Sequence, residues 1–484
     1  MNTPIRRVST VVALLFVSLL VSTSLVQFVW AKDLNARPDN RRTLLSTYAR
    51  ERGQILVGDT AIARSVPSDD EFQYLRTYPQ GRAWSHVTGW YSFFGAGGGL
   101  ELAENGLLSG SSDALFYRRV SDLFTGRKPQ GASLQLTLDT RAQAAAIRGL
   151  GDQRGAAVAL DPRTGAILAM VSNPTFDPND LASHDFDAVE QASRELTADP
   201  TAPLVNRAIG GDLYPPGSTF KVVTAAAALS SGDFDEDSVI PGPAELDLPQ
   251  TTATLPNSNG RACGPGGKTT LTNAMRISCN TAFGWLGMEV GADAFRQQAA
   301  RFGIGDELSV PMRVTPSSVP AELNEPQLAQ SAIGQYDVRV TPLQVAMVSA
   351  GVANDGVVMT PYLVQSVLGR DLGVLDETSP EELTQAVTPE VAAQLTRMME
   401  AVVRSGTGTA ARISGVDVAG KTGTAEQGEG RDPHAWFTGF APAGDPEVAV
   451  AVVVEDGGNA GSEAAGGRVA APIAKDIMEA VLDR

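Results

Sequence analysis

Hydrophobic and polar positions follow three successive patterns along this chain. An apolar run covers residues 8–30, and at about 1.5 Å per residue a helix of this length crosses a bilayer once. Residues 33 to about 130 contain short apolar pieces and many turn residues without a regular period. From Ser133 onward, alternating or wholly apolar runs bounded by turn residues indicate regular elements. The patterns predict an N-terminal span, an irregular segment and a folded body.

The folded body has predicted strands at both ends and predicted helices between them. Leu134, Leu136 and Leu138 alternate with polar residues as in a half-buried strand, and Asp139-Thr140 is a predicted N-cap. A hairpin and a C-terminal meander are predicted over residues 156–160, 166–171, 418–425, 435–440 and 448–455. Predicted helices cover residues 141–150, 218–229, 270–290 and 471–482. This order predicts an α+β fold in which the terminal strands form one antiparallel sheet with helices packed against it.

Composition narrows the possible functions. The chain has 484 residues, which suggests two or three domains, and a formal net charge of −17. Phosphate binding needs clustered Lys and Arg, so we expect no nucleic-acid partner. The two cysteines and three histidines do not have the spacing of a zinc site, so no metal is expected either.

The flanks of the apolar run indicate a compartment. Arg6 and Arg7 precede the run, and a basic flank stays in the cytoplasm, so the body is predicted to be extracytoplasmic. A cleaved signal peptide has a shorter apolar stretch and a small-residue cleavage site, whereas this run ends at Trp30. We therefore expect an uncleaved, single-pass anchor in the cell membrane. Cleavage remains the alternative, because polar residues interrupt the run.

Ser218 is the first candidate for catalysis. It follows the rigid turn Pro215-Pro216-Gly217 and opens a predicted helix, with Lys221 on the same helix face. A serine becomes a good nucleophile when an adjacent base removes its proton, and a lysine is such a base when burial or a second cation lowers its pKa. Taken alone, a Ser-x-x-Lys pair is more often a capping serine beside a solvated lysine.

Two further motifs lie later in the chain. Ser278-Cys279-Asn280 is on its own only a polar loop. Lys421-Thr422-Gly423-Thr424 lies on a predicted strand, where Gly423 lets a substrate backbone approach and the neighbouring side chains can hold a carboxylate. Alone it is equally an edge strand with a hairpin glycine. Ser-x-x-Lys, Ser-x-Asn and Lys-Thr-Gly-Thr in this order, separated by about 60 and about 140 residues, form the signature of the penicillin-recognising acyltransferases.

With these motifs the chain resembles the class B penicillin-binding proteins, the monofunctional peptidoglycan D,D-transpeptidases, of the actinobacterial PbpA type. The resemblance covers nearly the whole chain after the apolar run. The matching stretches are residues 52–55 (RGQI), 99–101 (GLE), 134–143 (LQLTLDTRAQ), 159–172 (ALDPRTGAILAMVS), 206–208 (NRA), 214–221 (YPPGSTFK), 334–335 (GQ), 408–410 (GTA) and 434–442 (HAWFTGFAP).

The resemblance implies a domain organisation. It predicts a penicillin-binding transpeptidase fold, an antiparallel sheet flanked by helices with a helical subdomain, preceded by a small pedestal and one transmembrane helix. We expect a cytoplasmic tail and anchor at 1–31, a non-catalytic, dimerisation-like pedestal at 32–150 and the transpeptidase domain at 151–484. No glycosyltransferase is recognisable, so the family expectation is a SEDS-type polymerase partner that makes the glycan strands.

The resemblance also implies roles for the motif residues. In this family a serine attacks the penultimate D-Ala carbonyl of a peptidoglycan stem peptide, D-Ala leaves, and an amine of a neighbouring stem takes the acyl group. Penicillin and other β-lactams acylate the same serine. By motif, the expected nucleophile, general base and proton relay are Ser218, Lys221 and Ser278. The expected substrate-binding residues are Asn280 for the backbone, Lys421, Thr422 and Thr424 for the terminal carboxylate, and Gly423. The N–H groups of Ser218 and Thr424 would form the oxyanion hole, and no cofactor is needed.

Cys279 inside the Ser-x-Asn motif is a departure. In an oxidising compartment, two lone cysteines 16 residues apart are candidates for a disulfide. We hypothesise a Cys263–Cys279 bond, worth about 3 kcal/mol in the chain-entropy model. Two separate thiols remain the alternative.

Rival functions differ in the fate of the acyl-enzyme, or in whether one forms at all. A D,D-carboxypeptidase or a β-lactamase forms the same acyl-enzyme, although no deacylating glutamate of a class A β-lactamase is evident. A catalytically idle division scaffold would not need all three motifs, and a β-lactam sensor would need a longer cytoplasmic segment. His434 suggests a Ser-His pair, but the chain contains no Gly-x-Ser-x-Gly elbow, so we expect a structural histidine.

Overall fold

The computed structural model describes residues 2–30, 34, 48–93, 95–112, 115, 130–428, 430–463 and 465–483. The N-terminal helix α1 (Asn2–Ser24) continues as the π-helical turn η1 (Leu25–Val29). Within the described ranges, Thr3–Val29 is the one helix long and apolar enough to cross a membrane, and the rest of the chain does not bury it. The predicted apolar helix is therefore confirmed, as either an anchor or a signal sequence.

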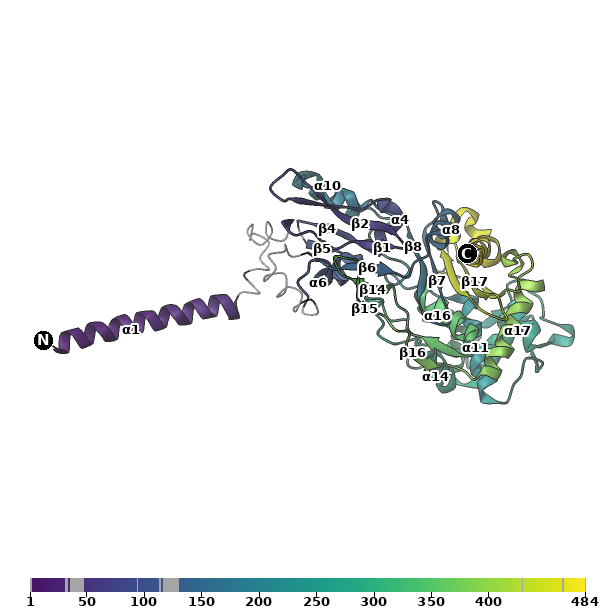
Figure 1. The fold of residues 1–484 in the computed structure, drawn as a ribbon. Coiled ribbons are helices and arrows are strands. Elements are labelled where there is room, and N and C mark those ends of the chain that lie inside the picture. Colours follow the sequence, from purple (N-terminus) through teal and green to yellow (C-terminus); the bar gives the residue numbers. More distant parts are fainter. Residues whose placement is uncertain are drawn as a thin grey trace.

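The first folded layer is a six-stranded sheet in the order β15-β14-β6-β1-β2-β3 (Figure 1). Its strands are β1 (Ile55–Val57), β2 (Thr60–Pro67), β3 (Tyr74–Thr77), β6 (Ser133–Leu136), β14 (Val364–Leu368) and β15 (Val374–Glu377). The prediction of an irregular segment before residue 130 was wrong here, because β1 to β3 and α4 (Gly81–Thr88) are regular elements. Two of these strands have only three or four residues, too few to establish a period.

A buried ion cluster ties these short elements together. Glu101 is fully buried and accepts hydrogen bonds from Arg52 Nε and Arg76 Nε, each at 2.6 Å. The Tyr78 hydroxyl donates to the same carboxylate at 3.2 Å. Both arginines are also buried, so the cluster places two cations around one anion away from water. Arg52 and Glu101 come from the RGQI and GLE stretches, and their contact explains why both are needed in one fold.

The second sheet has five antiparallel strands in the order β17-β18-β19-β7-β8. The strands are β7 (Gly155–Leu160), β8 (Ile167–Asn173), β17 (Ala419–Ala425), β18 (His434–Ala441) and β19 (Val448–Val454). The predicted hairpin and meander are confirmed, and the two ends of the folded body meet where β19 pairs with β7. The α+β prediction is confirmed with them.

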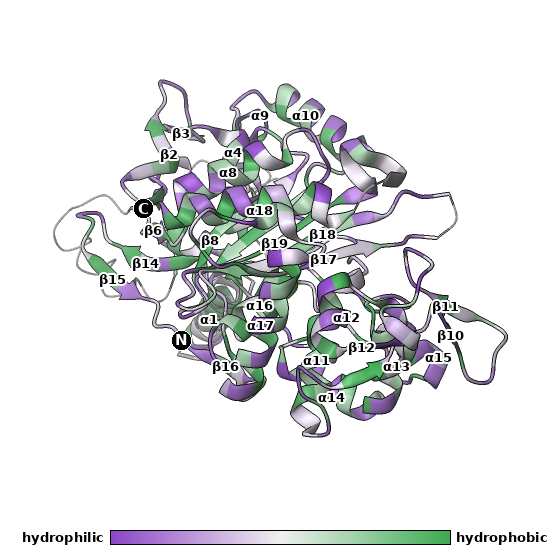
Figure 2. Cartoon of the chain, turned by 90° about the vertical axis from the view of Figure 1, so that its right-hand side faces the viewer, coloured by the Kyte–Doolittle hydropathy of each residue, from purple (hydrophilic) through white to green (hydrophobic). Residues whose placement is uncertain are grey.

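Helices bury both faces of this sheet. One face packs on α8 (Thr140–Leu150) and α18 (Gly466–Leu482), and the other on α16 (Pro342–Ala353). Along β7, Ala157 and Ala159 belong to the core on the α8 side, whereas Ala156 and Val158 belong to the core on the α16 side. Figure 2 shows the strands as a mainly hydrophobic layer between these helices. A strand buried on both faces is apolar throughout, which explains the unbroken apolar run over β19.

A mainly helical region lies beside β17 (Figure 1). Its helices are α11 (Lys221–Ser231), α12 (Leu271–Ile277), α13 (Asn280–Val290), α14 (Ala292–Arg301), α15 (Glu325–Ser331) and α17 (Pro389–Ser405). The single helix predicted over 270–290 was wrong, because α12 ends before Ser278 and α13 starts after Cys279. Ser278 has φ 61° and ψ 45°, a left-handed conformation that closes α12 and re-aims the chain.

The remaining elements connect these layers. They are β4 (Trp90–Ser92), β5 (Gly95–Gly97), α5 (Gly99–Ala103), α6 (Asn105–Leu108), α9 (Pro178–Ala182), α10 (Phe186–Ala198), η3 (Gly217–Phe220), β9 (Val239–Pro241), β10 (Glu245–Asp247), β11 (Thr254–Pro256), η4 (Pro265–Gly267), β12 (Lys268–Thr270), β13 (Val357–Met359), β16 (Glu382–Gln385), η5 (Thr409–Ala411) and η6 (Glu455–Glu463).

Candidate active site

The three motifs meet where η3, the start of α13 and β17 come together. Ser218 lies in η3, half-buried, one turn before the buried Lys221 at the start of α11. Gly217 has φ +54°, and a Cβ there would lie 2.7 Å from the carbonyl oxygen of Thr424. A Cβ on Gly423 would lie 3.0 Å from the carbonyl oxygen of Pro216. Glycine at both positions lets the serine turn pack directly against β17.

Lys221 connects the serine turn to the Ser-x-Asn motif. Its Nζ donates to the carbonyl oxygen of Ser278 at 2.8 Å and to Asn280 Oδ1 at 2.7 Å, and it lies 3.2 Å from Ser278 Oγ. Among the hydrogen bonds of the described residues there is none between Lys221 Nζ and Ser218 Oγ. A neutral amine that donates its two hydrogens to the two carbonyl-type oxygens keeps its lone pair for a hydroxyl. This arrangement suits a general base, because the lone pair of Lys221 Nζ is available to accept a proton.

Ser278 is also bound from the opposite side. Lys421 Nζ lies 2.9 Å from Ser278 Oγ and donates to the carbonyl oxygen of Thr422 at 2.8 Å. A single hydroxyl oxygen therefore contacts the Nζ atoms of two lysines from distant segments of the chain. The left-handed backbone at Ser278 costs a non-glycine residue about 1–2 kcal/mol, so these contacts must hold it in place.

Burial changes the charge state of both lysines. The Lys421 pKa is lowered to about 7, because burial penalises the charged form. The Lys221 pKa is lowered well below its ordinary value, first by burial and then by the nearby Lys421 cation. The lowered pKa favours the neutral amine of Lys221, the state that accepts a proton from a serine.

The KTGT motif forms most of β17, the outer strand of its sheet, which pairs with β18 on one side only. Lys421 and Thr422 are buried, and Thr422 Oγ1 lies 2.6 Å from Thr407 Oγ1. Thr424 is exposed. An extended peptide lying along an outer strand gains main-chain hydrogen bonds, as in strand addition.

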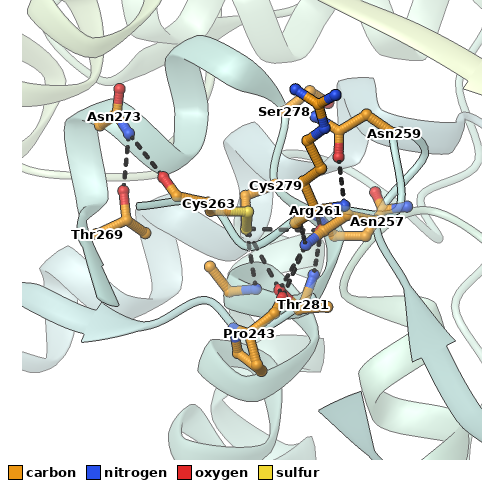
Figure 3. The surroundings of a disulfide bond; sticks show 12 residues. Pro243, Asn257, Asn259, Arg261, Cys263, Thr269, Asn273, Ser278, Cys279 and Thr281 are labelled. Atoms are coloured by element: carbon orange, nitrogen blue, oxygen red, sulfur yellow. Dashed lines mark hydrogen bonds between the residues drawn. A yellow bond between two sulfur atoms is a disulfide. The ribbon is translucent and has the colours of Figure 1, made fainter. Parts of the chain in front are cut away.

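The loop that carries Ser278 and Asn280 is held by a disulfide and by Asn257 (Figure 3). Cys263 and Cys279 are joined, with Cα atoms 6.1 Å apart. Asn257 Oδ1 accepts from the backbone N–H groups of Asn280 and Thr281, at 2.9 and 3.1 Å. Asn257 could not be identified from the sequence, because a single Asn in a polar loop belongs to no motif. The fold brings it to the N-terminal end of α13.

His434 lies at the start of β18, outside this cluster. Its Nδ1 accepts from the backbone N–H of Asp456 at 3.2 Å and lies 3.2 Å from Gln427 Nε2. Its ring packs edge-on against Tyr214, and burial lowers its pKa. These contacts fit the structural role expected from the sequence.

Comparison with known proteins gives matches over both folded parts. Residues 155–479 match the family model "Penicillin binding protein transpeptidase domain", and residues 52–134 match "Penicillin binding protein A dimerisation domain". The peptidoglycan D,D-transpeptidase PbpA of Mycolicibacterium smegmatis is 46% identical, with 100% of this chain and 99% of the relative covered. That of Mycobacterium tuberculosis is 44% identical with the same coverage.

Solved structures agree. Penicillin-binding protein A from M. tuberculosis as a ceftriaxone acyl-enzyme complex superposes with a TM-score of 0.87 at 43% identity. Its penicillin G acyl-enzyme complex superposes with a TM-score of 0.84 at 43% identity, and each comparison covers 90% of this chain and 100% of the other. The fold, the meeting of the three motifs and these matches show that this chain belongs to the class B penicillin-binding proteins, as a peptidoglycan D,D-transpeptidase of the PbpA type.

Proposed function

We propose that Ser218 is the acylated nucleophile of this transpeptidase and Lys221 its general base. Ser218 Oγ attacks the carbonyl carbon of the penultimate D-Ala, and its proton passes to Lys221 Nζ. The lowered pKa of Lys221 supports this assignment, because it favours the neutral amine, and a protonated lysine has no lone pair to accept the proton. The N–H groups of Ser218 and Thr424 stabilise the oxyanion, each such donor contributing about 3–4 kcal/mol.

Ser278 completes the first half-reaction in this proposal. The C–N bond to the terminal D-Ala breaks, and the departing amine takes a proton from Ser278 Oγ, which is replenished from Lys221. An ester between Ser218 and the stem peptide remains. In the second half an amine of a neighbouring stem attacks the ester carbonyl and loses a proton to Lys221. The C–O bond to Ser218 breaks as the new amide forms, and Lys221 returns the proton to Ser218 Oγ. The observation that carries the scheme is the convergence of Lys221 and Lys421 on Ser278 Oγ, at 3.2 and 2.9 Å.

The other motif residues hold the donor peptide. Asn280 binds the substrate backbone through its side-chain amide. Lys421, Thr422 and Thr424 bind the terminal carboxylate, and Gly423 lets the peptide backbone lie close to β17. We also infer that the Cys263–Cys279 bond forms in the oxidising compartment, where it tethers the Ser278 loop.

We further propose a single-pass anchor at 1–31, a non-catalytic pedestal at 32–150 and an extracytoplasmic transpeptidase domain at 151–484. Arg6 and Arg7 before the apolar helix support this orientation. The pedestal and catalytic parts share elements, since β14 pairs with β6 and α8 packs on α18. The sheet that carries them is therefore expected to move as one body with the active site. A SEDS-type polymerase is the proposed partner for strand synthesis.

Intact mass after incubation with a fluorescent penicillin tests the nucleophile. We expect one covalent adduct in the detergent-solubilised full chain, its absence in Ser218→Ala, and its presence in Cys279→Ala. An adduct that persists for hours separates a transpeptidase from a β-lactamase. A folded chain without any adduct would leave only the idle-scaffold alternative.

A further inference from the structure

A small cavity lies beside the buried ion cluster of the first sheet. Its volume is about 10 Å³, which is room for one particle of about the size of a water molecule. Three arginines line it, Arg50, Arg52 and Arg76, together with tyrosine and serine side chains that include Tyr48. Among the described residues of this lining there is no carboxylate. The cavity is therefore surrounded by cationic groups and hydroxyl groups.

Two buried donors of this lining have no hydrogen-bond partner within the described part of the chain. They are Arg76 Nη2 and the Tyr48 hydroxyl. Arg76 is 3% exposed and Tyr48 is 5% exposed, so both groups are nearly closed off from bulk water. The other nitrogens of Arg76 are paired, since Nε donates to Glu101 Oε1 at 2.6 Å and Nη1 donates to the carbonyl oxygen of Gly53 at 2.7 Å. A buried donor without an acceptor is destabilising, and more so when it is charged. An acceptor in the cavity would satisfy both donors.

The ion cluster beside the cavity carries an excess of positive charge. Arg52 and Arg76 share the carboxylate of Glu101, and no other described carboxylate forms an ion pair with either arginine. The Tyr91 ring, with its centroid 4.1 Å from the Arg52 guanidinium carbon, offsets only part of this excess. The exposed Arg50 adds a further positive charge to the lining. Burying a charge without a counterion is unfavourable, so a negative charge in the cavity would stabilise the fold.

The donors also distinguish an anion from a water molecule as the occupant. A water molecule that accepts from Arg76 Nη2 and from the Tyr48 hydroxyl needs acceptors for its own two hydrogens, whereas arginine side chains offer donors alone. A water molecule also leaves the excess charge uncompensated. An anion accepts from all sides and supplies the missing charge. The small volume favours a single-atom anion over a tetrahedral oxyanion such as sulfate.

We propose that this cavity binds one chloride-sized anion. Arg76 Nη2 and the Tyr48 hydroxyl donate to it, and the charges of Arg50 and Arg52 attract it. The ion links Tyr48, which precedes β1, to Arg76 on β3. The Tyr48 ring also stacks on Phe93, with ring centroids 4.7 Å apart, so the ion joins the buried ion cluster to an aromatic cluster. The proposal uses no step of the acylation mechanism, and either can fail without the other.

Replacing gluconate by chloride at constant ionic strength tests the site. Gluconate is too large for the cavity, so charge screening stays constant while the ion that fits is varied. Urea unfolding of the full chain in detergent measures the gain in the free energy of unfolding, for the wild type and for Tyr48→Phe, which loses the hydroxyl donor and keeps the ring. We expect chloride to bind the variant about tenfold more weakly. Saturating chloride should then stabilise the wild type by about 1.4 kcal/mol more than the variant.

Further variants separate the site from general effects of salt. Arg50→Gln removes an exposed charge from the lining and should weaken chloride binding roughly threefold. Tyr362→Phe and Arg194→Gln make the same chemical changes outside the cavity and should keep the wild-type gain. Chlorine NMR line widths of the folded chain measure chloride binding independently, and the excess width should fall in Tyr48→Phe.

Two results would overturn the site. Equal gains in the wild type and Tyr48→Phe, or equal chlorine line widths in the two proteins, would mean that chloride does not contact the Tyr48 hydroxyl. A gain that falls equally in Tyr48→Phe and Tyr362→Phe would mean that the loss does not come from the cavity.

Discussion

Removing the Cys263–Cys279 disulfide should lower the free energy of unfolding by an amount that depends on the length of the loop that it closes. The bond closes a loop of 16 residues, and the chain-entropy model assigns a loop of this size about 3 kcal/mol at 25 °C. Cys263→Ala removes only the bond. Cys279→Ala also removes the sulfur that caps α13, which lies 3.4 Å from the backbone nitrogen of Ala282.

The two variants should therefore differ. We expect Cys263→Ala to cost about 3 kcal/mol, and Cys279→Ala to cost up to about 1 kcal/mol more, the usual value of a lost N-cap. Adding a reductant to the wild type should give nearly the same loss as Cys263→Ala. The same reductant should leave Cys263→Ala unchanged, which makes this variant its own control.

Denaturant unfolding of the full chain in detergent, monitored by circular dichroism with and without reductant, measures these differences. Alkylation of the unfolded wild type under non-reducing conditions counts the thiols. Two alkylated cysteines, or a wild type and Cys263→Ala of equal stability, would refute the cross-link. Equal losses in the two variants would refute the capping contribution alone.

Three further predictions concern the buried charges and the close contact at β17. Glu101→Gln should lower the free energy of unfolding by about 3–5 kcal/mol, because it leaves Arg52 and Arg76 without their shared anion. Urea denaturation measures this loss, with Glu195→Gln on an exposed helix as the control. Burial lowers the folded pKa of Lys421 to about 7, so above that pH the unfolded chain binds more protons and the free energy of unfolding should rise from about pH 7 to 10. Lys421→Met should remove a rise of roughly 1.4 kcal/mol per pH unit. Denaturation midpoints at about pH 7.5 and 9.5 measure this, with Lys475→Met as the control. Gly423→Ala should slow penicillin acylation at least roughly tenfold, because its Cβ would lie 2.9 Å from Trp436 Cβ and 3.0 Å from the Pro216 carbonyl oxygen, whereas Gly444→Ala, with nothing within 4 Å, should not.

Strands that are buried along their whole length were predicted correctly, because burial gives them a long apolar run in the sequence. Strands β7, β8 and β19 are buried on both faces, so their apolar runs were visible without knowledge of their neighbours. Asp139 was correctly identified as a cap, since it accepts from the N–H groups of Arg141 and Ala142. These signals are local, and local signals survive in a single sequence.

The sequence failed where structure depends on distant partners. β1 is stabilised by pairing with β2 and β6. It has only three residues, so its sequence shows no periodicity from which a strand could be predicted. β14 and β15 join the same sheet from more than 200 residues further along the chain. The break at Ser278 was missed because residues 270–290 are helix formers on both sides, and only the left-handed turn at Ser278 separates α12 from α13.

The catalytic cluster combines both cases. Its residue types were identifiable from the ordered motifs, but the sequence suggested that Lys221 contacts Ser218, whereas Lys221 Nζ hydrogen-bonds to Ser278 and Asn280. The lysine therefore links the helix of the proposed nucleophile, Ser218, to the loop of the proposed relay, Ser278. In the proposed scheme, a proton that Lys221 receives can pass to Ser278 Oγ, which lies 3.2 Å from Nζ.

Burying Lys221 and Lys421 side by side works against the stability of the fold. Each unit by which burial lowers a lysine pKa below its unfolded value represents about 1.4 kcal/mol of lost stability, in full below the folded pKa and shrinking to zero as the pH rises to the unfolded value. The second cation adds to the shift of the first, so separating the two lysines would stabilise the chain. The proposed chemistry accounts for their position instead: burial and then Lys421 lower the pKa of Lys221, which favours the neutral amine that the proposed activation of Ser218 requires. A shifted lysine pair in contact with one hydroxyl is thus evidence for catalysis that is independent of the motifs.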